Sequence, residues 1–272
     1  MIAKKFDFFL KFKIFRFIFE FFRRFTKHDI LGMAAKAAYY LLISFFPLSI
    51  LLISVIAANG AAMFEYIMPA SVLVILEDIL KIKPQRGLTI ISIIITIWSA
   101  SRSIWALMNG IYVIHTGHQR GRLKKGRIRA FFYVILLAAA TVTLVSLTFI
   151  STYAEALFAE YFSGITLPLI KIGRIAAVIG IMFCFSASLY IITPGVEVKI
   201  RDVFIGSLVT SIGWVGATLA FEIYMKMFNN YSLLYGSIGA FLGLALWLFI
   251  VTIVLFCGAE LNEMLRGARK KL

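Results

Sequence analysis

The chain has 272 residues, of which 61% are hydrophobic, with a mean hydropathy of +0.94 and a formal net charge of +15. This composition lies outside the range of ordinary soluble domains and excludes a water-facing enzyme with one buried core. In a soluble protein such a basic balance would suggest nucleic acid binding. Here the lysines and arginines are segregated from the apolar segments. Their distribution therefore indicates, first of all, which side of a membrane each connection faces.

Six long, almost uncharged segments make up most of the sequence, and each is long enough to cross a bilayer. A hydrocarbon core requires about 20 apolar residues in a helix, because lipid offers no hydrogen-bond partner to an open backbone. The sequence therefore predicts an all-α integral membrane protein with six transmembrane helices. The segments cover residues 37–64, 88–114, 130–154, 175–196, 203–221 and 227–259.

The first 29 residues form a basic arm that precedes the spans. On a helical wheel its charged residues share one face and its aromatic and aliphatic residues share the other. This pattern predicts an amphipathic helix that lies in the membrane interface, with cations among anionic headgroups. A helix packed on the cytoplasmic face of its own bundle is the alternative. The charged face holds Lys13, Arg16, Glu20, Arg23, Arg24 and Lys27, and the apolar face holds Ile14, Phe15, Ile18, Phe21, Phe22 and Phe25.

Basic residues are concentrated in the arm, in the connection 115–129 and in the tail 265–272. Six spans place all three on one side, which the positive-inside rule assigns to the cytoplasm. On the opposite side, the helix-like pattern at 69–81 predicts a short outer interfacial helix. Because no linker or repeat divides the chain, residues 30–264 are expected to form one transmembrane domain between the arm 1–29 and the tail.

Three ionisable residues in or beside the spans are the first candidates for a binding site, because a charge at membrane depth is costly unless it is paired or hydrated. Lys36 begins the first span, Arg102 lies well inside the second, and Glu260 closes the sixth. All three are expected in the cytoplasmic half of the bundle, where Glu260 would neutralise one cation and leave a net positive site. Alternatively, Lys36 and Glu260 lie near enough to span ends to reach the headgroups.

Helix breakers and small residues are the next candidates. Pro47 in the first span and Pro194 at the end of the fourth are expected to act as hinges, although prolines are also ordinary in membrane helices. Gly236, Gly239 and Gly243 lie along one side of the sixth span. Such spacing predicts close helix packing, and it allows a homo-oligomer without requiring one.

Signatures of catalysis and of cofactor binding are missing from the sequence. Cys184 and Cys257 lie apart in apolar spans, which indicates packing residues rather than a disulfide or a metal cluster. His28, His115 and His118 lie in basic segments without metal-ligand spacing, and the last two are expected to be solvated. No nucleophile, base and orienting group can be assembled, and no ATP-binding motif is visible, so we expect no enzyme, metal or cofactor.

Five short motifs follow one another along the chain. They include the polar residues Ser99, Asn109, Tyr190, Tyr235 and Asn262. The motifs are Ala38-Tyr39-Tyr40 leading to Ser44-Phe45-Phe46-Pro47-Leu48, Trp98-Ser99-Ala100-Ser101 followed by Asn109, Tyr190 with Pro194, Tyr235-Gly236-Ser237-Ile238-Gly239-Ala240, and Gly258-Ala259-Glu260-Leu261-Asn262. Their order and spacing resemble the YihY/BrkB family of bacterial inner-membrane proteins, once labelled ribonuclease BN. The resemblance covers residues 30–263. It implies six transmembrane helices with both termini in the cytoplasm.

The resemblance also implies a role in envelope biology or lipid transport. Our leading hypothesis is a transporter or flippase-like protein for an anionic lipid or envelope precursor, with Lys36 and Arg102 attracting the headgroup. Glu260 would hold the cations when the site is empty, and energy would come from an ion gradient or a partner. The residues expected to line the path are Tyr39, Tyr40 and Trp98.

Two other classes of function remain open. A non-transporting membrane scaffold would use the basic arm and the connection 120–129 to recruit anionic lipid or an acidic protein partner. A membrane-bound ribonuclease is the third hypothesis, but electrostatic binding of RNA by a basic loop is not hydrolysis. The expected partners are therefore membrane lipids, anionic ones above all, and not nucleic acid.

Overall fold

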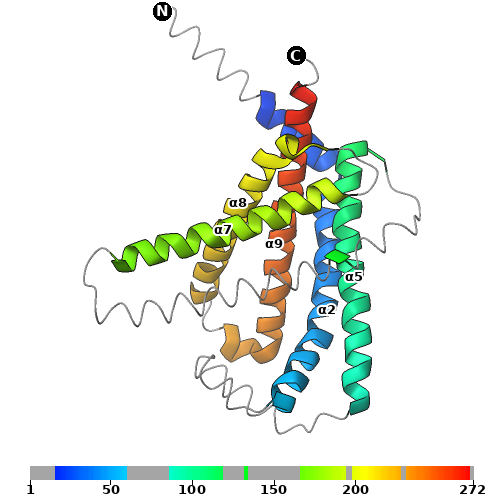
Figure 1. The fold of residues 1–272 in the computed structure, drawn as a ribbon, viewed down its shortest axis with the longest axis vertical. Coiled ribbons are helices and arrows are strands. Elements are labelled where there is room, and N and C mark those ends of the chain that lie inside the picture. Colours follow the sequence, from blue (N-terminus) through cyan, green and yellow to red (C-terminus); the bar gives the residue numbers. More distant parts are fainter. Residues whose placement is uncertain are drawn as a thin grey trace, which may run out of the picture. The chain divides into compact units, whose positions relative to one another are not determined.

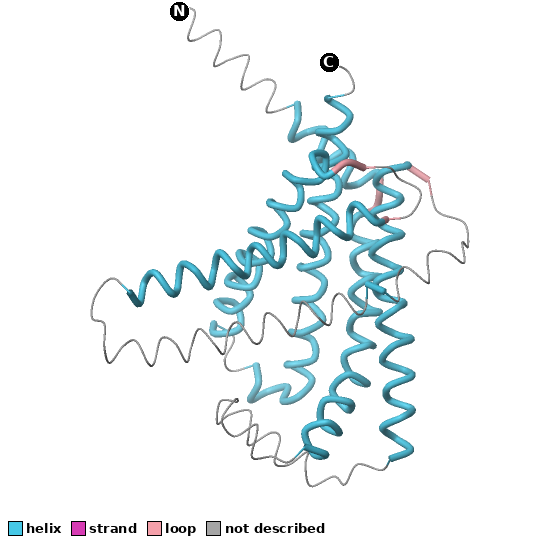
Figure 2. The backbone as a smooth tube through the Cα atoms, viewed as in Figure 1, coloured by secondary structure: helices cyan, strands magenta, loops and turns pink. Residues whose placement is uncertain are grey.

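The computed structural model describes residues 16–59, 86–118, 132–133, 166–193, 198–227 and 231–269, which are helical apart from short turns (Figures 1 and 2). Residues 16–27 form a first helix. The longer helices are α2 (Ile30–Asn59), α5 (Arg86–Thr116), α7 (Thr166–Ile192), α8 (Ile200–Met227) and α9 (Tyr231–Arg269). Within these ranges no strand occurs, so the all-α prediction is confirmed for them.

The five long helices coincide with the first, second, fourth, fifth and sixth predicted spans. Apart from residues 132–133, the predicted third span at 130–154 lies outside the described residues, and so does the predicted outer helix at 69–81. In the described part of the chain, three helical stretches are long and apolar enough to cross a membrane: Ile175–Ile192, Ile200–Tyr224 and Phe241–Arg269.

Large apolar side chains on α5 and α8 are left uncovered by protein, among them Ile94, Leu219 and Ile223. Apolar helices that expose so much of their surface are stable in lipid rather than in water. Length, apolarity and exposure therefore agree on a membrane protein.

Two compact units interleave along the chain. Unit 1 contains Met1–Ala37, Ala106–Leu123 and Met182–Leu272, and unit 2 contains Ala38–Trp105 and Lys124–Ile181. Helices α8 and α9 belong wholly to unit 1, whereas α2, α5 and α7 contribute residues to both units.

In unit 1, α8 and α9 lie next to each other (Figure 1). Glycines form their closest contacts. A Cβ atom on Gly206 would overlap the carbonyl oxygen of Gly258. A Cβ atom on Gly258 would overlap the Thr210 hydroxyl and lie 2.8 Å from the Gly206 carbonyl oxygen. Val254 lies one turn before Gly258 on α9, and a Cβ atom on Gly213 of α8 would lie 2.7 Å from one of its methyl groups. Small residues thus let the two backbones approach, as they do in membrane helix pairs.

Buried hydrogen bonds reinforce this contact. The Tyr190 hydroxyl on α7 donates to the Leu255 carbonyl of α9 at 2.7 Å and lies 2.8 Å from the Thr210 hydroxyl of α8. The Gly206 amide donates to Oδ1 of Asn262 at 2.7 Å. Two residues of the sequence motifs, Tyr190 and Asn262, therefore join α7, α8 and α9 inside unit 1.

We expect Tyr190→Phe to lower the free energy of unfolding by about 1–3 kcal/mol, because a buried hydroxyl and its partners lose their hydrogen bonds. Tyr39→Phe is the matched control, since Tyr39 is 58% exposed. Unfolding of both variants in mixed micelles, followed by far-UV circular dichroism, measures the difference. Equal stability of the two variants would contradict the assigned role of the Tyr190 hydroxyl.

Candidate functional site

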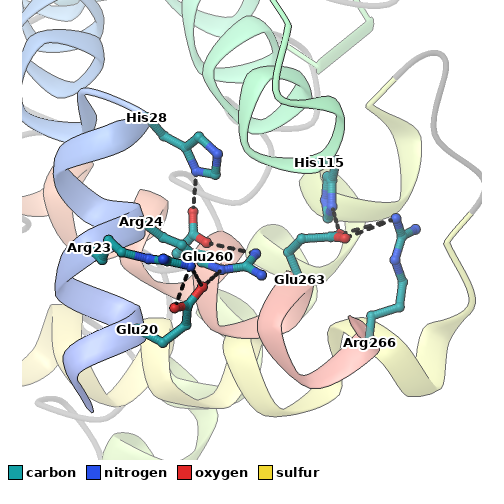
Figure 3. Close-up of polar contacts among 8 residues, drawn as sticks. All are labelled: Glu20, Arg23, Arg24, His28, His115, Glu260, Glu263 and Arg266. Carbon is teal, nitrogen blue, oxygen red and sulfur yellow. Dashed lines mark hydrogen bonds and ion pairs between the residues drawn. The ribbon is translucent and has the colours of Figure 1, made fainter. Parts of the chain in front are cut away.

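A buried carboxylate is the centre of a charged cluster in unit 1 (Figure 3). The Glu260 side chain on α9 is 0% exposed, and its Oε2 lies 2.7 Å from Nδ1 of His28. Its Oε1 lies 3.6 Å from Nη1 of Arg24, in the helix of residues 16–27. Arg24 also contacts Glu20 at 2.9 Å. These contacts attach the N-terminal helix and the turn after it to α9.

A tight turn places His28 beside α9. The His28 amide donates to the Arg24 carbonyl at 2.9 Å, and the Asp29 amide donates to the Thr26 carbonyl at 3.1 Å. Asp29 adopts a φ of 50°, a left-handed conformation that aspartate tolerates better than most residues. Its carboxylate accepts a hydrogen bond from the Gly32 amide at 3.2 Å and caps the start of α2.

A second carboxylate lies one turn further along α9. Oε2 of Glu263 lies 2.6 Å from Nδ1 of His115 and 3.1 Å from Nη2 of Arg266. The His115 side chain, in the last turn of α5, is 1% exposed. Figure 3 shows the two glutamates side by side on α9, each with its own histidine. We call Glu260–His28 and Glu263–His115 the two glutamate–histidine pairs.

The local charges also act on Glu20 in the N-terminal helix. Hydrogen bonds from Arg23 and Arg24 lower the pKa of the Glu20 carboxyl below its ordinary value. Partial burial tends to lower the pKa of Arg24, but the hydrogen bond to Glu20 and the charge of Glu260 outweigh it and raise the pKa. The Glu20 and Arg24 side chains are therefore both charged at neutral pH.

The partners of Glu260 differ from those expected from the sequence. Glu260 was predicted to neutralise Lys36 or Arg102, but its partners are Arg24 and His28, and Lys36 is exposed. The expectation that His115 is solvated is wrong, because its side chain is buried against Glu263. Among the residues that the structure describes, no three His, Cys, Asp or Glu side chains gather as a metal site.

In unit 2, Arg102 rests on aromatic rings between α2 and α5. Its Cζ lies 5.0 Å from the ring centroid of Trp98, one turn earlier on α5, and 5.9 Å from that of Tyr40 on α2. Tyr39 extends the group, with its ring 5.6 Å from that of Tyr40. The Ser99 side chain is buried beside them on α5 and donates to the Ile95 carbonyl at 2.7 Å.

Arg102 thus contacts two of the three residues predicted to line the path, Tyr40 and Trp98. The third, Tyr39, contacts the ring of Tyr40. Lys36 and Glu260 belong to unit 1 and Arg102 belongs to unit 2, so a single cluster of the three stays a prediction.

The remaining predicted residues lie as follows. Helix α2 continues through Pro47, so this proline does not end the helix, and Pro194 lies outside the described residues. Asn109 lies in α5, and its Oδ1 is buried. Helix α9 contains Tyr235, Gly236, Gly239 and Gly243.

Sequence reasoning missed Arg24, His28, His115 and Glu263 as parts of a site. The spacing of Glu260 and Glu263 on one helix was the available signal, because residues three apart face the same side. Their partners come from the N-terminal helix, the turn after it and the end of α5, and no local pattern reports such contacts.

Comparisons with known proteins match nearly the whole chain. The family model for virulence factor BrkB matches residues 21–272. The putative ribonuclease-like protein YfkH of Bacillus subtilis (strain 168) is 27% identical over 270 residues, which are 94% of this chain and 97% of YfkH. A UPF0761 membrane protein of Kangiella koreensis is 26% identical over 254 residues, 87% of this chain and 60% of that protein.

The chain spans only part of the UPF0761 relatives. The UPF0761 membrane protein lpg0643 of Legionella pneumophila is 38% identical over 74 residues, which are 27% of this chain and 18% of that protein. No solved structure matches. The family match confirms the resemblance noted from the motifs: the chain belongs to the virulence factor BrkB family of membrane proteins.

Proposed function

We propose that the protein is a transporter or flippase-like protein for an anionic lipid or envelope precursor, and that Arg102 attracts the charged headgroup. The supporting observation is the surroundings of Arg102, near the middle of α5 (Arg86–Thr116). Its described contacts are the rings of Trp98 and Tyr40. Transport of this kind needs no catalytic group.

The energetics of Arg102 favour an anionic ligand. A cation–π contact contributes about 0.5–2 kcal/mol, whereas an arginine at the centre of a membrane helix costs about 2.5–3.5 kcal/mol or more. The rings therefore compensate the charge only in part. A phosphate or carboxylate would supply the rest, and the Trp98 ring, which is 58% exposed, offers an apolar surface beside it.

The proposed topology follows from the charge distribution. Six transmembrane helices would place the arm 1–29, the connection 115–129 and the tail 265–272 in the bacterial cytoplasm, with residues 30–264 as the membrane domain. Lys36, close to the start of α2, would then meet headgroups at the cytoplasmic surface. Pro47 and Pro194 remain the proposed hinges.

Lipid translocation in proteoliposomes tests the role of Arg102. We expect Arg102→Ala to slow the movement of a fluorescent anionic phospholipid about tenfold or more, and Arg102→Lys to slow it less, since a lysine keeps the charge but not the planar group. Arg201→Ala is the control, because Arg201 is an exposed arginine at the start of α8. Equal rates for the intact protein and Arg102→Ala would remove Arg102 from the mechanism.

A membrane scaffold is the second candidate, supported by the N-terminal helix. Phe19 and Phe22 of this helix are 63% and 62% exposed, and its exposed basic residues include Arg16, Arg23 and Lys27. Such a surface fits an anionic bilayer. If the scaffold hypothesis holds, the Arg102 variants transport no less than the intact protein, and replacing Arg16, Arg23 and Lys27 with glutamine abolishes function.

A further inference from the structure

Two carboxylates of unit 1, the buried Glu260 and the partly exposed Glu263, each make a short contact with an imidazole. The distances are 2.7 Å from His28 Nδ1 to Glu260 and 2.6 Å from His115 Nδ1 to Glu263. At such distances a hydrogen bond joins nitrogen and oxygen, and the contact becomes an ion pair when the imidazole carries a second proton. Each pair is therefore a site that can hold a proton between two elements of the fold.

Each pair also includes a buried polar atom whose hydrogen-bonding capacity is unused. Within the described ranges, Oε1 of Glu260 accepts no hydrogen bond, and Nε2 of His115 has no hydrogen-bond partner. Such buried atoms are rare, because each one forgoes the hydrogen bonds that water would supply. A water molecule that delivers a proton could donate a hydrogen bond to either atom.

Charged and titratable side chains from the N-terminal helix and from α9 surround the two pairs. Arg24 faces Glu260 from the N-terminal helix, and Arg266 faces Glu263 from α9 itself. Further titratable groups close to the cluster are Glu20, which contacts Arg24, and Cys257, one turn before Glu260 on α9. Arginines stay protonated at all physiological pH values, whereas an unperturbed histidine changes charge between about pH 5 and 8.

Proton loss would weaken specific contacts. Without the imidazolium charge, the Arg24 guanidinium, at 3.6 Å, is the one cationic partner left to the Glu260 carboxylate among the residues that the structure describes. A buried charge with one distant partner is unfavourable, so the attachment of the N-terminal helix to α9 weakens. The same loss at His115 weakens the attachment of the end of α5 to α9.

We propose that the two glutamate–histidine pairs are proton-binding sites, and that the proton is the coupling ion of the transport proposed above. The inference rests on that proposed function for its coupling role, whereas proton binding itself does not depend on it. Protonation attaches residues 16–28 and the end of α5 to α9, and deprotonation releases them. The energy source is then the proton gradient across the membrane.

Proton binding is measured directly by nitrogen NMR of the full chain in lipid nanodiscs, with the imidazole rings labelled. The chain has three histidines, so the variants His28→Gln, His115→Gln and His118→Gln assign every signal. We expect the rings of His28 and His115 to take up and release a proton as the pH is changed. We also expect the His28 signal to respond to Glu260→Gln, because the Glu260 carboxylate lies 2.7 Å from Nδ1 of His28. The signal of the exposed His118 should not respond to Glu260→Gln. Rings that keep one charge state throughout would overturn the proposal.

Coupling is measured in proteoliposomes by following a fluorescent anionic phospholipid with and without a proton gradient. We expect a protonophore to slow translocation several-fold in the intact protein and in His118→Gln, and to have no effect in His28→Gln with His115→Gln. Translocation that ignores the gradient would overturn the coupling role and leave the proposed function standing. Absence of translocation under every condition would overturn both, and the NMR result would still decide on proton binding.

Discussion

Replacing Gly258 with alanine should lower the free energy of unfolding by about 3 kcal/mol, because the contact between α8 and α9 has no room for a methyl group. The new Cβ atom would overlap the Thr210 hydroxyl and lie 2.6 Å from the Tyr190 hydroxyl and 2.8 Å from the Gly206 carbonyl oxygen. The backbone oxygen cannot move unless the helices separate. Separation would also break the hydrogen bond between the Gly206 amide and Asn262.

Gly267→Ala on α9 and Gly216→Ala on α8 are the matched controls, since a Cβ atom at either position meets nothing within 4 Å. Alanine favours a helix over glycine by about 1 kcal/mol, so both controls should be neutral or slightly stabilising. Unfolding in mixed micelles compares the three variants. A Gly258→Ala protein as stable as the controls would contradict the glycine contact.

Removing both basic side chains that face Glu260 should detach the N-terminal helix. Arg24→Ala with His28→Ala leaves a carboxylate that is 0% exposed without a positive partner, and an uncompensated buried charge costs about 3–5 kcal/mol. The chain avoids this cost by exposing Glu260 to water, which requires residues 16–28 to leave α9. Amide hydrogen exchange in residues 16–27 should then approach the rate of an unstructured peptide.

A neutral side chain in place of Glu260 tests whether the buried charge is what detaches the helix. Adding Glu260→Gln to the double variant removes the buried charge, so protection of residues 16–27 should partly return. Arg23→Ala with Lys27→Ala removes two exposed charges from the same helix and should leave exchange nearly unchanged. Equal exchange in the two double variants would show that Glu260 does not hold the helix.

Hydrophobic length predicted most of the fold, because backbone groups in lipid must be paired within a helix. The predicted spans 203–221 and 227–259 lie almost wholly within α8 (Ile200–Met227) and α9 (Tyr231–Arg269), but both helices extend further. The last turns of α9 carry charged residues that hydropathy assigns to the tail. They stay helical because Glu263 and Arg266 form ion pairs in unit 1.

The candidate site was predictable only in part. Glu260 is conspicuous in the sequence as an ionisable group at the end of an apolar span, but its partner His28 lies 232 residues away along the chain. The glycine contact was missed for the same reason, because Gly206 looks like any membrane-helix glycine until Gly258 is placed against it. By contrast, Trp98 and Arg102 are one helical turn apart, so their contact was accessible to sequence reasoning.

The most direct test of the proposed function compares headgroups rather than variants. Intact protein in proteoliposomes would be supplied with two fluorescent phospholipids of the same chain length, one with an anionic headgroup and one with a zwitterionic headgroup, and loss from one leaflet would be followed. We expect the anionic lipid to move faster than in empty vesicles, and faster than the zwitterionic lipid by a margin that Arg102→Gln removes. Equal slow movement of both lipids, with a working scramblase as positive control, would contradict transport of an anionic lipid by this protein.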